Sequence, residues 1–67
     1  MYRNITTVPG MSPAMINALA ARGIVNYCNA LPPRARKSHV QVFVMADGSI
    51  VPASHSVLCE VVREIRR

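Results

Sequence analysis

Residues 40–51, VQVFVMADGSIV, give the clearest structural signal in this chain of 67 residues. The first half alternates between apolar residues on two faces, with three valines on one side, as expected of a β-strand. Asp47-Gly48 supplies the left-handed residues of a tight turn, and residues 49–51 provide the returning strand. The stretch therefore predicts a β-hairpin, whose second strand Pro52 ends or marks as a sheet edge.

The alternate positions of the first strand, Gln41, Phe43 and Met45, lie on the face opposite the valines. Helices of the same chain cover this second face, or it is a contact surface for another molecule. On the second interpretation, Phe43 and Met45 are candidate contacts for a second copy of the chain or for a target protein.

Helices are predicted on both sides of the hairpin. Ser12-Pro13 opens the first helix, because Ser is a good N-cap and Pro suits the first helical position, and Gly23 ends it. Ser54 or Ser56 begins the last helix. That helix has an apolar face, formed by Val57, Leu58, Val61, Val62 and Ile65.

The rest of the chain completes one small domain. Residues 1–10 are expected to be extended and to end in a Pro9-Gly10 turn. Residues 24–31, IVNYCNAL, are predicted to form a second short helix that Pro32-Pro33 ends. The predicted fold is therefore α+β, in the order helix, short helix, β-hairpin, helix, within a single domain of residues 1–67.

The charge is distributed unevenly along the chain. The net charge is +5, and the first 46 residues contain no aspartate or glutamate. The densest basic segment contains Arg34, Arg36, Lys37 and His39. Arginine binds phosphate in a bidentate manner and lysine binds it as a point charge, so a polyanionic partner is indicated. The alternative is a solvated basic surface that keeps the protein soluble.

Composition narrows the class of protein further. A small and mainly aliphatic core favours self-association, so we expect a homodimer. Two cysteines do not make a disulfide scaffold, and no apolar run reaches the length of a membrane span, so we expect reduced thiols in a cytoplasmic protein. Without a recognisable Cys–His or Ser–His signature, we expect a binding protein and no enzyme or cofactor.

A nominal zinc-ligand set exists in the sequence, namely Cys28, His39, His55 and Cys59. His55 and Cys59 are four residues apart and could share a helical face, but Cys28 and His39 do not have a recognised zinc spacing. We therefore expect no metal site, with His39 belonging to the basic segment.

Several short motifs resemble small phage DNA-binding regulators. Residues 10–24, GMSPAMINALAARGI, are similar to the second half of their helix–turn–helix, and residues 32–36, PPRAR, to segments of the same proteins. Residues 44–50 resemble the terminal hairpin of Cro-type repressors, and the hairpin followed by a capped helix resembles excisionase-type winged domains. Val8-Pro9-Gly10-Met11-Ser12 also resembles the hairpin of a helix–hairpin–helix. These resemblances imply a winged-helix-like fold and binding to DNA.

The leading hypothesis is a small DNA-binding regulator of phage or mobile-element type. Its basic segment would hold phosphates, Ser12 and Asn17 would approach the groove, and Arg22 would support the helix end. The alternative is a protein-interaction module or inhibitor that docks on an acidic protein.

Overall fold

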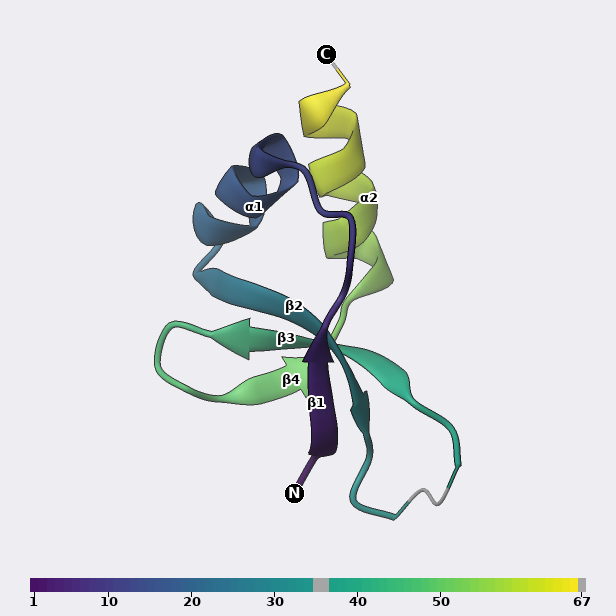
Figure 1. Ribbon diagram of the computed structural model, residues 1–67. Coiled ribbons are helices and arrows are strands. Elements are labelled where there is room, and N and C mark those ends of the chain that lie inside the picture. Colours follow the sequence, from purple (N-terminus) through teal and green to yellow (C-terminus); the bar gives the residue numbers. More distant parts are fainter. Residues whose placement is uncertain (35–36, 67) are drawn as a thin grey trace.

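The computed structural model describes residues 1–34 and 37–66 (Figure 1). In chain order its elements are β1 (Arg3–Thr7), α1 (Pro13–Ala20), β2 (Ile24–Leu31), β3 (Val40–Met45), β4 (Ile50–Pro52) and α2 (His55–Ile65). The fold is thus α+β, in the order β-α-β-β-β-α.

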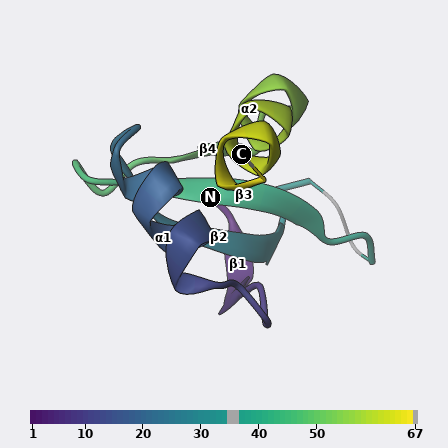
Figure 2. The same cartoon turned by 90° about the horizontal axis from the view of Figure 1, so that it is seen from above.

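The strands form one antiparallel sheet in the order β1-β2-β3-β4. Both helices lie over the same face of this sheet and beside each other (Figures 1 and 2). Within the described part of the chain, no helix combines the length and apolar character needed to cross a bilayer.

The predicted hairpin is confirmed. Strand β3 pairs with β4 through Phe43 opposite Val51 and Val44 opposite Ile50. In its turn only Gly48 is left-handed, with a φ of +89°; Asp47, which the sequence also assigned to the left-handed conformation, does not have a positive φ. β4 is an edge strand that ends at Pro52, where a missing N–H does not interrupt the sheet.

The two capped helices are also confirmed. The Ser12 hydroxyl accepts a hydrogen bond from the Met15 N–H at 3.2 Å, and the Ser54 hydroxyl accepts one from the Val57 N–H at 3.5 Å. Gly23 follows α1 with a φ of +78° and turns the chain into β2. Local side-chain chemistry therefore places both helix starts.

The predicted short helix at residues 24–31 is wrong, because this segment is the central strand β2. A strand that packs on both faces has a nearly continuous apolar sequence. Because a short apolar run is compatible with either a helix or a strand, the sequence pattern did not distinguish the two. Tyr27 packs toward the helices, whereas its neighbour Cys28 packs on the other side of the sheet. With a strand here, the helix–short helix unit and the winged-helix-like arrangement are both absent from the described residues.

Strand β1 corresponds to the extended segment expected at residues 1–10. Its pairing with β2 shifts register between Arg3 and Thr6, and Asn4 within this bulge has a φ of +52°. Asparagine tolerates this left-handed conformation better than most residues. Beyond the strand, Gly10 has a φ of +80° in the turn that leads to α1.

Apolar residues pack on both faces of the sheet. Under the helices, Tyr27 and Phe43 face each other with ring centroids 5.6 Å apart and pack with Leu19 of α1 and Val61 of α2. On the other face, a smaller cluster is formed by Cys28, Ala30 and Val42, with Tyr2, Val44 and Ile50 packed against it. The helices therefore cover the Phe43 face, as the first of the two sequence interpretations expected.

Replacing Phe43 by alanine tests this packing. Phe43 is 3% exposed, so Phe43→Ala should lower the free energy of unfolding by about 3–5 kcal/mol. Val25→Thr is the matched control, because Val25 is 61% exposed and Thr keeps its β-branched shape; it should change stability by less than about 0.5 kcal/mol. Urea denaturation measures both, and an unchanged midpoint for Phe43→Ala would contradict the described core.

Acidification tests the β3–β4 turn. The Ser49 hydroxyl and N–H donate to Asp47 Oδ1 at 2.6 and 2.9 Å and lower the pKa of Asp47 below its ordinary value of 3.8. These bonds therefore stabilise the fold above the unfolded-state pKa, and their contribution is lost as pH falls through the lower folded-state value. Ser49→Ala should melt below the wild type at about pH 6, with the gap narrowing toward about pH 2. A gap in melting temperature that stays constant across this range would show that Asp47 does not act through Ser49.

Candidate nucleic-acid interface

The acidic residues of α2 form ion pairs with an arginine of the same chain. Arg22, just after α1, places Nη1 2.9 Å from Glu64 Oε2 and Nε 4.0 Å from Glu60 Oε2. The same Nη1 donates to the Ala18 carbonyl at 2.8 Å, which fixes the guanidinium over the end of α1. Glu60 and Glu64 thus compensate Arg22.

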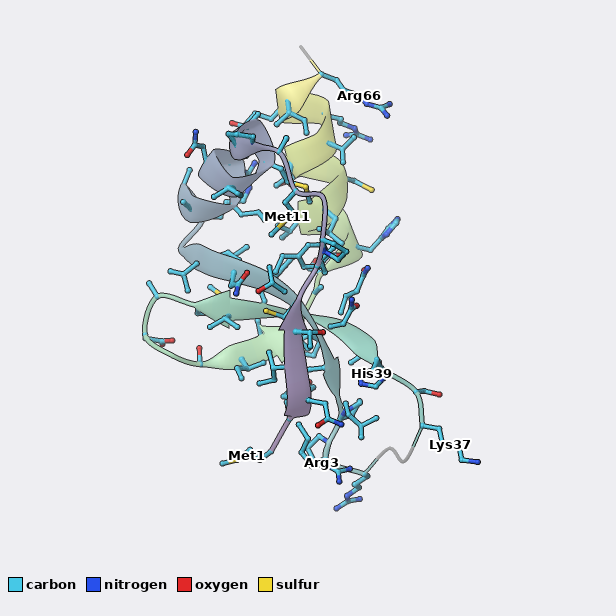
Figure 3. The ribbon with its side chains drawn as sticks, in the orientation of Figure 1. Met1, Arg3, Met11, Lys37, His39 and Arg66 are labelled. Carbon is cyan, nitrogen blue, oxygen red and sulfur yellow. The ribbon has the colours of Figure 1, made fainter. Side chains whose placement is uncertain are left out.

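Apart from Arg22, the described basic residues of the first 46 positions lie at the other end of the molecule. Arg34 and Lys37 lie in the connection between β2 and β3, and His39 immediately precedes β3; all three are exposed. Arg3 joins them, because its Cα pairs with Leu31 at the end of β2. Figure 3 shows Arg3, Lys37 and His39 toward the end of the molecule that holds Met1, with Arg66 at the far end.

We call Arg3, Arg34, Lys37 and His39 the basic end. Arg36, which the sequence also assigned to phosphate binding, lies outside the described residues. The third acidic residue, Asp47, sits in the β3–β4 turn and accepts hydrogen bonds from Ser49. The chain has no other aspartate or glutamate, so no carboxylate side chain belongs to the basic end.

The structure separates the other predicted DNA-contacting residues from the basic end. Ser12 caps α1 and Asn17 lies within it, and α1 lies beside α2 and away from the β2–β3 connection (Figure 1). The Ser12 hydroxyl already caps α1, and Arg22 is held by Glu64. The predicted set therefore does not form one surface, and only Arg34, Lys37 and His39 of the described members lie together.

The predicted partner-contact residues lie under the helices. Phe43 is 3% exposed and packs against Tyr27, and Met45 is half-buried against the same cluster. The ring of Phe43 supports the sheet–helix core, so its removal would report on folding before it reported on binding.

The nominal zinc ligands are dispersed. Cys28 is buried at 1% exposure on the sheet face opposite the helices, and His39 belongs to the basic end. Only His55 and Cys59 on α2 are close, with Nε2 and Sγ 3.5 Å apart. No group of three or more His, Cys, Asp or Glu side chains in residues 1–34 and 37–66 is arranged to hold a metal ion.

Sequence reasoning missed Arg3 as a member of the basic end. Arg3 and Arg34 are far apart in the chain and are brought together by the pairing of β1 with β2. The extended character of residues 1–10 was visible, but an extended segment alone does not identify its partner strand. Only the assignment of residues 24–31 as a strand would have indicated that Arg3 lies beside the end of that segment.

Comparison of the chain with protein-family models, with curated proteins and with solved structures gives no match. The functional assignment therefore depends on the geometry and charge of the molecule itself.

A double-mutant cycle tests the Arg22 contact. Arg22→Met and Glu64→Gln should each reduce the free energy of unfolding, and their coupling should be about 0.2–1 kcal/mol because both groups are partly exposed. The coupling should shrink in about 1 M salt, since screening weakens exposed ion pairs. Additive effects of the two changes in thermal or urea unfolding would show that the pair does not hold α1 to α2.

Proposed function

We propose that the protein binds duplex DNA through the basic end, with Arg34, Lys37 and Arg3 contacting phosphates. The observation that supports this most is the charge partition. The α2 carboxylates compensate Arg22, and the remaining carboxylate lies in a separate turn, so the basic end keeps its positive charge. Concentrating like charges in so small a fold costs self-repulsion, which a polyanion relieves.

The residue types at the basic end suit phosphate recognition. Guanidinium groups bind phosphate oxygens in a fork geometry, and the Lys37 ammonium binds as a point charge. Each neutralised phosphate releases condensed counterions, so binding of this kind weakens steeply with salt and is independent of sequence. About three contacts predict a roughly 40-fold loss of affinity between about 50 and 200 mM salt.

Fluorescence anisotropy of labelled mixed-sequence duplexes at these two salt concentrations tests the proposal. Wild-type protein should bind at the lower salt, Lys37→Met should reduce the salt slope by about one, and Arg34→Glu with Lys37→Glu should abolish binding. Arg66→Met is the matched control, because it removes one exposed positive charge at the far end of the molecule. It should bind as the wild type does.

Three outcomes would overturn the proposal. Absence of binding at about 50 mM salt would remove DNA as the partner. Equal weakening by Arg66→Met and Lys37→Met would show that binding is not localised to the basic end. Binding of poly-glutamate in preference to the duplex would favour an acidic protein partner instead. Circular dichroism of each variant verifies that the fold is intact.

A further inference from the structure

A row of uncharged polar side chains crosses three strands beside the basic end. Thr6 of β1 pairs with Asn29 of β2, and Asn29 pairs with Gln41 of β3. Directly paired residues of antiparallel strands project from the same face of a sheet. The three side chains therefore form one continuous strip across β1, β2 and β3.

This strip lies on the sheet face that the helices cover only in part. Asn29 and Gln41 are each two residues from the Tyr27–Phe43 pair, which places them on the same face. Tyr27 and Phe43 are buried, whereas Gln41 and Thr6 are exposed and Asn29 is half-buried. On β3 the face thus changes from buried and apolar at Phe43 to exposed and polar at Gln41, whereas on β2 the half-buried Asn29 lies between the buried Tyr27 and Leu31.

The carboxamides of the strip are not used by the fold. By contrast, Asn26 donates to the Thr7 hydroxyl at 3.1 Å and accepts from the Tyr27 N–H at 2.9 Å. Within the described part of the chain, the side chains of Asn29 and Gln41 have no hydrogen-bond partner. Asparagine is unfavourable inside strands, and no side-chain hydrogen bond within the described residues offsets this at Asn29.

The next step toward the β2–β3 connection adds positive charge on the same face. Arg3 supplies it, because Arg3 pairs with Leu31, which is two residues beyond Asn29. A ligand lying on this surface would therefore place anionic groups against the basic end and neutral polar groups against the strip. A duplex presents this combination, with phosphates at the rim of the major groove and base edges at its floor.

We propose that Asn29 and Gln41 contact base edges in the major groove of the DNA that the basic end holds by its phosphates. This inference rests on the proposed function and adds sequence preference to it. β-Sheet proteins place strands in the major groove, and Asn29 and Gln41 stand opposite each other on the paired strands β2 and β3, beyond the residues of β3 that β4 pairs with and beside β1. A carboxamide forms paired hydrogen bonds with adenine N6 and N7, so the preferred sites contain adenine.

Selection from a pool of randomised duplexes tests the inference. Wild-type protein should enrich an adenine-containing site, and Gln41→Ala and Asn29→Thr should each reduce discrimination between that site and a scrambled duplex by about tenfold or more. Both variants should keep the wild-type salt slope, because no phosphate contact is removed. Asn17→Ala is the matched control, since it removes an exposed carboxamide from α1.

Substitution of the base separates direct contact from an indirect effect of the mutation on the sheet. A selected duplex in which 7-deazaadenine replaces adenine lacks the N7 acceptor. It should bind wild-type protein more weakly than the normal duplex does; the loss should be smaller for Gln41→Ala, which keeps only the Asn29 contact, and absent for the double variant Gln41→Ala with Asn29→Thr. A purely structural role of Gln41 would not produce this difference.

The outcomes distinguish this inference from the proposed function. Salt-dependent binding without enrichment, or enrichment that Gln41→Ala retains, would overturn the base contacts and leave the phosphate contacts intact. Loss of enrichment in Asn17→Ala alone would move base recognition to α1 and also overturn the inference. Absence of any duplex binding by the wild-type protein would overturn both.

Discussion

The antiparallel pairing of β2 with β3 places an aromatic pair on one face of the sheet and a thiol–valine pair on the other. Tyr27 and Phe43 receive the two helices, while Cys28 and Val42 anchor the cluster that Tyr2 and Ile50 flank. Every other element attaches to this ladder, because β1 and β4 pair with its outer edges and the helices pack on its aromatic side. The same pairing aligns Asn29 with Gln41, so the core and the proposed base-contacting strip share one register.

Electrostatics and packing are linked through Arg22. Its guanidinium joins the end of α1 to Glu64 on α2, and the two carboxylates of α2 offset part of the positive charge of Arg22, Arg63 and Arg66 at the helical end of the molecule. The β2–β3 connection receives no carboxylate, and Arg3 adds another positive charge when β1 pairs with β2. One partly exposed ion pair therefore helps to hold the helices together and leaves the two ends of the molecule with different electrostatic character.

Local chemistry explains which parts of the fold were predictable from sequence. The Asp47-Gly48 turn and the Ser12 and Ser54 caps act within a few residues of themselves, so the hairpin and both helices could be placed correctly. Residues 24–31 could not be assigned in this way, since their conformation depends on neighbours supplied by distant segments. The error extended to the candidate site, because the position of Arg3 and the alignment of Asn29 with Gln41 both require β2 to be a strand.

The two edges of the sheet are both poorly suited to receiving another strand. At β1, the bulge around Asn4 interrupts the regular spacing of backbone hydrogen-bonding groups, and Arg3 adds charge. At β4, the strand spans only Ile50–Pro52, and proline lacks the N–H that a neighbouring strand would need. The sheet consequently resists open-ended growth from chain to chain. If two copies associate, the contact must use side-chain surfaces and not a shared sheet.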